Sequence, residues 1–534
     1  MKFLVVLLFL CIFESSVAAT ILENCTPPFS SNNLLLETNK QIEEVSAEEL
    51  QLEEAIKNPE YLLKNWIELP TSPKANQKTR FLSLREAILL ALRYNPNIKN
   101  AELDRIIQRY QLRLAHNEFE LQYALSGTAF VEKSHYSDVG SVTTKNYLLT
   151  PELDLKTKLG SQLSLKMDNN VAAYGNYNPL LNLSFSQPLL RGFGKDANEA
   201  GLLNAIDNEW MNKVNLRQSI MDQITQVILI YRSLVLSGNN LQNQRQQLQE
   251  AETSFQINEK RINAGQLEPT GNIQQSYQIE SLKLTVEQAE NDFRNTSQDL
   301  LQALGLDPDM KIAVPNDVSL NKIIIPKMED ALAVGLAHNN QYLALQNTLK
   351  ADERAYKMAK NQQLWQLDFN ANIQAGTMTG VDSTSPGVPG LYKGHNIDKA
   401  AGITLTIPIN DVSSKNQLIT AKVQLEKDRI NLIAAKRALI TSIKNTISNI
   451  ESQAKRYELA KRQVELALRA YTLEKKKQQA GISSALDVNS TQNQLLLAQR
   501  GLISAKVDYL NQLALLQRLL GTTLDYWKIK LRYC

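Results

Sequence analysis

The chain has 534 residues, and its 58 Lys and Arg against 55 Asp and Glu leave a formal charge of only +3, so nothing in the charge points to nucleic acid as a partner. Apolar residues make up 43% and aromatic residues 6%, with 21 Gly, 16 Pro and 3 Cys. This composition excludes disordered, collagen-like and disulfide-dense proteins, and it favours long helices over an all-β body.

The N-terminus has the pattern of a secretory signal peptide. Lys2 precedes the apolar run Phe3 to Phe13, and the small residues Val17 to Ala19 follow it. We therefore expect residues 1–19 to be removed on export. The apolar run is too short to cross a bilayer as a helix, and no later segment offers about 18 consecutive apolar residues without charge.

Residues 20–80 are polar and are expected to form a separate N-terminal extension. Two cysteines remain after processing, Cys25 and Cys534. In an oxidising compartment they either form a disulfide or stay as free thiols, and the sequence leaves both possibilities open.

An internal duplication organises the rest of the chain. The segment LREAILLALRYNP from Leu84 is similar to KMEDALAVGLAHNN from Lys327, and RINAGQ from Arg261 is similar to KQQAGI from Lys477. The first copy carries an insertion of about 24 residues between roughly Ala129 and Leu183. We expect a first repeat at 81–310 with an extra hairpin at about 145–170, a linker at 311–325, a second repeat at 326–526 and a tail at 527–534.

Each repeat has the pattern helix, strands, helix, helix. No proline lies between Pro188 and Pro269, so residues 196–262 are predicted to form one helix roughly 100 Å long at 1.5 Å per residue. An apolar residue recurs at every seventh position of this helix, and the helix after Pro408 has the same register, which predicts left-handed supercoiling. The positions are Ile220, Val227, Leu234, Leu241, Leu248, Phe255 and Ile262, then Ile443, Ile450, Tyr457, Val464 and Tyr471.

The companion positions of this stripe become polar toward the far end of the first long helix, at Gly238, Arg245, Glu252 and Glu259. A narrow apolar seam of this kind suits a thin wall of helices better than a solid bundle. An ordinary extended coiled coil is the alternative interpretation.

The strands alternate apolar and polar residues. Residues 366–375, QLDFNANIQA, do so perfectly, and about ten tilted residues suffice to cross a bilayer as a β-strand. Similar patterns at 123–131, 181–185 and 403–409 give four core strands. The insertion alternates from Leu153 to Met167, which predicts the extra hairpin but not its place.

Four strands cannot close a barrel, and unpaired strand edges are costly in lipid, so the chain is expected to oligomerise, for example as three copies with twelve strands. Soluble, half-buried strands are the alternative.

This order of elements, with REAILLALRYNPNI from Arg85, SFSQPLLRGFG from Ser184 and RINAGQ from Arg261, occurs twice and resembles the TolC-like outer-membrane efflux family over about residues 81–526. The resemblance implies a mainly α fold with a β-barrel sector, in which a homotrimer forms a twelve-stranded outer-membrane barrel continued by an α-helical barrel across the periplasm of a Gram-negative bacterium.

The function implied by this resemblance is that of a passive exit duct for a tripartite efflux pump or a type I secretion system. Its partners would be outer-membrane lipid, a periplasmic adaptor protein and an inner-membrane pump. The alternative is a non-conducting periplasmic or surface coiled-coil structural protein.

The resemblance also implies functional positions at the helix tips. The turns at Ala264-Gly265 and Ala480-Gly481 correspond to the tips that contact the adaptor, although either glycine also suits a plain helix stop. The segment SSALDVNSTQ aligns with the family's periplasmic gate, where two aspartates three residues apart ring the closed pore. Asp487 matches the first aspartate and Ser490 replaces the second.

Three copies of Asp487 around a narrow pore would favour cations, with Leu486 or Val488 helping to narrow it, whereas a lone first-turn aspartate also suits the helix dipole. The family's basic partner is not evident, because residues 482–486 carry no charge.

Other chemistry is not indicated by the sequence. The four histidines are widely spaced and form no zinc-binding motif. RGFGKDANEAG, from Arg191, lacks the spacing of phosphate-binding loops and is expected to be a turn. We therefore expect neither a cofactor nor an enzymatic activity.

Overall fold

The computed structural model divides into two compact units, Met1–Leu69 and Pro70–Cys534. It describes residues 80–138, 140–172, 177–265, 271–315, 317–318, 320, 322–376, 391, 397–480, 482–483 and 485–531, all of which belong to the second unit. The predicted signal peptide, the extension up to residue 79, Cys25, Gly481 and Cys534 lie outside the described residues.

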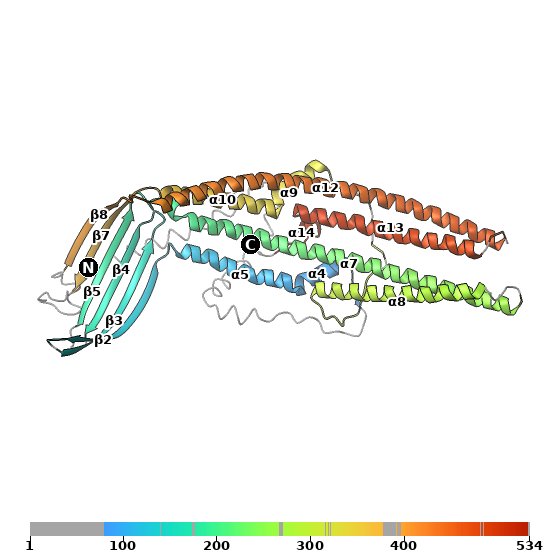
Figure 1. Cartoon of the computed structure of the whole chain (residues 1–534), viewed down its shortest axis with the longest axis horizontal. Coiled ribbons are helices and arrows are strands. Elements are labelled where there is room, and N and C mark those ends of the chain that lie inside the picture. Colours follow the sequence, from blue (N-terminus) through green and yellow to red (C-terminus); the bar gives the residue numbers. More distant parts are fainter. Residues whose placement is uncertain are drawn as a thin grey trace, which may run out of the picture. The chain divides into compact units, whose positions relative to one another are not determined.

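Two runs of elements follow one another in similar order (Figure 1). The first comprises β1 (Arg80–Phe81), α4 (Leu84–Tyr94), α5 (Pro96–Asn117), β2 (Gln122–Tyr136), β3 (Gly140–Lys156), β4 (Gln162–Ala172), β5 (Tyr177–Pro188), α6 (Lys195–Asn198), α7 (Ala200–Asn263) and α8 (Gly271–Leu304). After β6 (Ile312–Ala313), which pairs with β1, the second comprises α9 (Met328–His338), α10 (Asn340–Asn361), β7 (Gln366–Gly376), β8 (Ile397–Thr406), α12 (Val412–Gln479), α13 (Ala485–Leu520) and α14 (Thr523–Tyr526).

An asparagine separates the first two helices of each run and ties them to the last helix. The Asn95 side chain accepts from Asn97 N at 2.8 Å, which caps α5, and its Nδ2 donates to Ala303 O of α8 at 2.7 Å. Asn339 likewise caps α10 and donates to Leu519 O of α13 at 3.1 Å. Short polar side chains are favoured at such caps because they satisfy otherwise unpaired backbone N–H groups.

The two long helices have 64 residues in α7 and 68 in α12. The predicted start of the first at residue 196 is wrong, since Glu199 separates the short α6 from α7. The stripe at every seventh residue faces the core in the first half of α7, where Ile220, Val227, Leu234 and Leu241 are buried, and Ile443 and Ile450 are buried on α12.

Toward the tips the seam becomes narrow. Tyr457, Val464 and Tyr471 are half-buried, while the polar position Arg245 is exposed and forms an ion pair with Glu290 of α8 at 2.6 Å. Each long helix pairs with the helix that follows it, α7 with α8 and α12 with α13 (Figure 1). The helices therefore form narrow antiparallel pairs with wet outer surfaces.

Six strands form one antiparallel sheet in the order β2-β3-β4-β5-β7-β8, at one end of the long helices (Figure 1). The sequence predicts four core strands and leaves the extra hairpin unplaced. The structure puts this hairpin, β3 and β4, inside the sheet between β2 and β5. The pattern expected to continue to Ile409 ends earlier, because β8 stops at Thr406.

Among the described residues, no helix combines the length and the apolar character that a bilayer span requires.

Candidate functional site

One face of the sheet is apolar across all six strands. Paired residues of an antiparallel sheet share a face, so the register places Tyr123, Leu153, Leu165, Leu183 and Ile373 on the same side. Many of these side chains are exposed, with Tyr123 at 82% and Leu125 at 69%. Other exposed apolar residues of this face are Val131, Tyr147, Leu149, Leu153, Leu163, Ile373, Ile397, Ile403 and Leu405. So large an apolar surface requires a non-aqueous environment or a partner.

Among the described residues of the six strands, charged side chains on this apolar face occur only toward the strand ends away from the helices. They are Lys133, Lys145 and Lys399. Such long side chains place their ammonium groups at the rim of an apolar layer. The opposite face is largely polar, with Asp154, Ser164, Ser184 and Asn372 in successive register positions, and it carries Phe130 and Val142 toward the far ends of β2 and β3. This two-sided pattern is that of a barrel wall with lipid outside and water inside.

The first helix tip ends in a left-handed glycine cap, and the second ends in a hydrogen bond that spans its turn. Gly265 follows α7 with φ of 71°, and Ala264 N donates to Lys260 O at 3.1 Å. After α12, Ile482 N donates to Lys477 O at 2.9 Å, the bond that closes a Schellman motif. Both tips thus have ordinary helix stops. Whether they also contact a partner stays a prediction.

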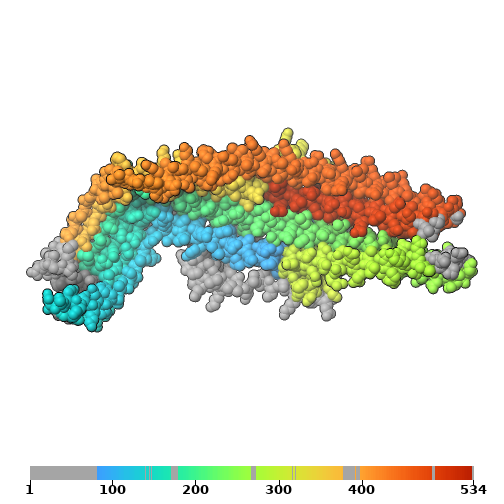
Figure 2. Space-filling view, in the orientation of Figure 1, coloured from blue at the N-terminus to red at the C-terminus, as the bar shows by residue number. Residues whose placement is uncertain are grey.

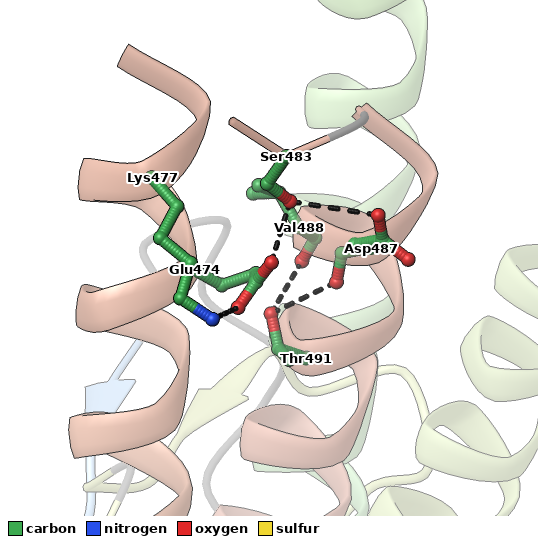
Figure 3. Close-up of polar contacts among 6 residues, drawn as sticks. All are labelled: Glu474, Lys477, Ser483, Asp487, Val488 and Thr491. Carbon is green, nitrogen blue, oxygen red and sulfur yellow. Dashed lines mark hydrogen bonds and ion pairs between the residues drawn. The ribbon is translucent and has the colours of Figure 1, made fainter. Parts of the chain in front are cut away.

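A polar cluster joins α12 and α13 at the second tip (Figure 3). Ser483 Oγ donates to Glu474 Oε1, and Lys477 Nζ donates to Glu474 Oε2 at 3.1 Å. These hydrogen bonds, with that of Ser483 the larger cause, lower the pKa of Glu474. The Glu474 side chain is 18% exposed, so its charge is held between the two helices.

Asp487 is exposed in the first turn of α13, on the border of this cluster. Its Oδ2 lies 3.5 Å from Ser483 Oγ, and its backbone carbonyl accepts from Thr491 Oγ1 at 3.1 Å (Figure 3). Ser490 is also exposed. Of the two residues expected to help narrow the pore, Val488 is 7% exposed and buried within the chain, and the side chain of Leu486 lies outside the described residues.

Glu474 is the residue of this tip that the sequence analysis missed. The sequence did contain a signal for it, because Ala460, Ala467 and Glu474 recur at every seventh position on a half-buried side of α12, where a carboxylate follows two small apolar residues. Lys477, before the turn, is the basic residue that pairs with Glu474.

A pair of aspartates, Asp352 and Asp428, lies between α10 and α12. The pKa of Asp352 is raised from 3.8 to about 6, chiefly by burial and then by a hydrogen bond to Asp428 and the charge of Asp428. Asp428 is buried and accepts from Gln424 Nε2 at 2.7 Å and Asn431 Nδ2 at 3.0 Å. These bonds, together with the one from Asp352, lower the pKa of Asp428. The pair therefore holds one proton more readily than two isolated aspartates do.

We expect this pair to make stability depend on pH. The pKa of Asp352 is raised from 3.8 to about 6, so between these values the native chain holds a proton that the unfolded chain has released. Its contribution to stability therefore falls as the pH rises through that window. Asp352→Asn is expected to reduce the difference in thermal unfolding temperature between about pH 5 and about pH 7.5. Asp309→Asn, on an exposed loop, is the control and should change nothing; an unchanged difference in Asp352→Asn would contradict the assignment.

The helix surfaces near the tips also expose apolar side chains at regular spacing. On α12 these are Leu459, Leu466 and Leu473, and on α8 they are Ile273, Tyr277 and Leu284. Figure 2 shows α12 as an uncovered ridge along one edge of the helical part. A seven-residue apolar stripe on a helix surface is the usual contact surface for another helix.

The comparisons with known proteins agree with this geometry. Residues 332–522 match the family model described as outer membrane efflux protein. No curated protein sequence matches the chain.

Solved structures match the chain at low sequence identity but over most of its length. The outer membrane protein VceC of Vibrio cholerae has a TM-score of 0.61 at 16% identity, with 82% of this chain and 96% of that chain covered. The Campylobacter jejuni CmeC outer membrane channel has a TM-score of 0.62 at 14% identity, covering 82% and 86%. The Neisseria gonorrhoeae MtrE outer membrane channel, in its open state, has a TM-score of 0.60 at 18% identity, covering 83% and 89%.

The fold of the described chain, a sheet joined to two long antiparallel helix pairs, is therefore that of outer-membrane efflux channels. Residues 332–522 carry the sequence pattern of the outer membrane efflux protein family, and the predicted resemblance to the TolC-like family is confirmed.

Proposed function

We propose that the protein is an outer-membrane export channel assembled from three copies, the exit duct of a tripartite efflux pump or a type I secretion system. The observation that carries this proposal is the apolar face that runs across all six strands and is exposed on five of them, with a largely polar face behind it. In water this face would remain uncovered, whereas in a bilayer it is the required outer surface of a barrel.

The edges of the sheet support assembly from several copies. β2 and β8 each lack a partner on one side among the described residues, and unpaired backbone groups in hydrocarbon cost several kcal/mol each. The exposed stripes on α8 and α12 give each copy two further contact surfaces outside the membrane. Closure with neighbouring copies covers both the edges and the stripes.

The helix tips are the part of this assembly that would face the cell interior. We propose that the turns at Ala264-Gly265 and Ala480-Gly481 contact a periplasmic adaptor, which connects the channel to an inner-membrane pump. Exposed basic residues Lys260, Arg261 and Lys476 next to these turns would favour acidic surfaces on that partner. Asp487, with Ser490 one turn later, would line the closed pore.

Purification and planar-bilayer recording test the channel proposal. We expect a protein that needs detergent, has the mass of three copies and conducts ions. A detergent-free soluble monomer without conductance would contradict it and would favour the non-conducting coiled-coil protein instead.

The gate assignment has its own test, in the substitution Asp487→Ala. Removing three carboxylates from the constriction is expected to lower the cation-to-anion permeability ratio of the closed channel, measured as a reversal potential across a salt gradient. Asp508→Ala is a matched control, because Asp508 is also exposed on α13 and its Oδ2 also lies 3.5 Å from a serine four residues earlier, Ser504. A permeability ratio that is the same in both variants would remove Asp487 from the gate.

A further inference from the structure

The inserted hairpin occupies the middle of the sheet, because both of its outer sides are paired. β3 pairs with β2 from Gln122↔Asp154 to Tyr136↔Gly140. β4 pairs with β5 from Gln162↔Ser186 to Val171↔Tyr177. The hairpin therefore separates β2 from β5 by two strands along the length of both ladders.

The two faces of the sheet continue through the hairpin without interruption. Leu153 and Leu165 face each other on the apolar side, flanked by Tyr123 of β2 and Leu183 of β5. On the polar side the hairpin carries Glu152, Asp154, Lys166 and Asp168, and Thr150 Oγ1 donates to Asp168 Oδ1 at 3.1 Å. A hairpin that projected away from the wall into water would have no reason to keep this alternation.

The turn of the hairpin, residues 157–161, is built into the corner that leads from β5 to α7. Leu159 O accepts from Gly194 N at 3.1 Å, and Lys158 Nζ lies 3.3 Å from Glu199 Oε1. Gly160 has φ of 98°, and a Cβ there would lie 2.6 Å from Gly192 O. Only glycine fits this close approach, so the position of the hairpin is fixed by the corner as well as by its two neighbouring strands.

The number of strands also allows the edge strands of neighbouring copies to pair in antiparallel orientation. All neighbouring strands are antiparallel, so with six strands the edge strands β2 and β8 run in opposite directions. β8 of one copy then meets β2 of the next copy in antiparallel orientation. A two-strand insertion keeps this arrangement, whereas a one-strand insertion would break it.

We infer that the hairpin forms part of the membrane wall, so that each copy contributes six strands and three copies close an eighteen-stranded barrel instead of a twelve-stranded one. This inference rests on the trimeric channel proposed above. Barrel diameter grows roughly in proportion to strand number, so the outlet is about half again as wide and has roughly twice the cross-section. An outlet of this width, with a lining of mixed charge, suits a bulky cargo such as a polypeptide, and it leaves the selection of cargo to the helix tips.

Cysteine accessibility tests the place of the hairpin. In a chain with Cys25 and Cys534 replaced by serine, Leu165→Cys and Lys166→Cys are reconstituted in lipid vesicles and treated with a charged, membrane-impermeant maleimide. We expect the cysteine at position 166 to react from the aqueous lumen and the one at position 165 to be protected by lipid. Ile373→Cys and Asn372→Cys on β7 are the reference pair, with protection at 373 and reaction at 372.

Two failures are distinguishable in this experiment. Equal reaction at 165 and 166, with the contrast on β7 intact, overturns the six-stranded wall and leaves the channel proposal standing. Loss of the contrast on β7 overturns the channel proposal and the wider barrel together. A cryo-EM reconstruction of the protein in lipid nanodiscs gives the count directly: eighteen strands are expected, and twelve would overturn the inference whether they came from two copies or from three.

Discussion

Replacing Gly305 with alanine is expected to destabilise the protein much more than replacing Gly521, although the two glycines occupy equivalent places after α8 and α13. Both have left-handed backbones, with φ of 70° and 72°, and this conformation costs an L-amino acid such as alanine about 1–2 kcal/mol. The difference lies in the neighbouring backbone. A Cβ at position 305 would lie 2.1 Å from Tyr94 O, whereas at position 521 it would lie 2.9 Å from His338 O.

The Gly305→Ala variant must therefore displace the end of α4, which also positions the Asn95 cap of α5. We expect a large fall in the thermal unfolding temperature of the detergent-solubilised protein, followed by circular dichroism, and a smaller fall for Gly521→Ala. Gly201→Ala is the control, because this helical glycine has no atom within 4 Å of an added Cβ. The higher helix propensity of the introduced alanine should stabilise α7 by up to about 1 kcal/mol. Equal losses at 305 and 521 would show that the approach to Tyr94 is unimportant.

Glu209→Gln is expected to cost about 3–5 kcal/mol of stability, because it leaves a buried guanidinium without its counter-charge. Arg105 of α5 donates through Nη1 to Glu209 Oε2 of α7 at 2.8 Å and through Nη2 to Oε1. The two side chains are only 6% and 12% exposed. The loss should appear as a lower unfolding temperature, and α5 is the element expected to detach first in hydrogen exchange.

Two variants separate burial from charge pairing in this prediction. Glu465→Gln breaks the Arg469–Glu465 pair on the exposed surface of α12, and about 1 kcal/mol or less is expected there. The double variant Arg105→Met with Glu209→Leu removes both buried charges and should recover most of the stability lost in Glu209→Gln. A double variant no more stable than Glu209→Gln would show that packing, not the unpaired charge, causes the loss.

The sequence was sufficient for the elements whose pattern is periodic. The seven-residue stripe from Ile220 to Leu241 is buried as predicted, and the strand predicted at 366–375 is β7 almost to the residue, because burial of one helix or sheet face forces such a period on the chain. The start of α7 could not be predicted from the sequence in this way. Nothing periodic marks Glu199, which separates α6 from α7.

The candidate site was predictable only in outline. The turns follow from local motifs and Asp487 from the family resemblance, but the exposure of a single side chain follows from neither. Val488, one of the two residues expected to help narrow the pore, is buried. The pairing of Glu474 with Ser483 and that of Asp352 with Asp428 bring together residues from different helices or turns. Such contacts depend on helix rotation and register, which no single segment of sequence specifies.

The place of the inserted hairpin has a consequence for how such proteins diversify. Its chain enters and leaves the sheet at the border away from the helices, after Tyr136 of β2 and before Tyr177 of β5, and only its turn meets the corner at Gly192 and Gly194. The hairpin therefore adds two strands without adding residues to α7 or α12. In the proposed channel, the strands that set the width of the outlet and the helix tips that meet the adaptor are thus separate parts of one polypeptide. The number of strands can therefore increase during evolution without any change in the helix tips.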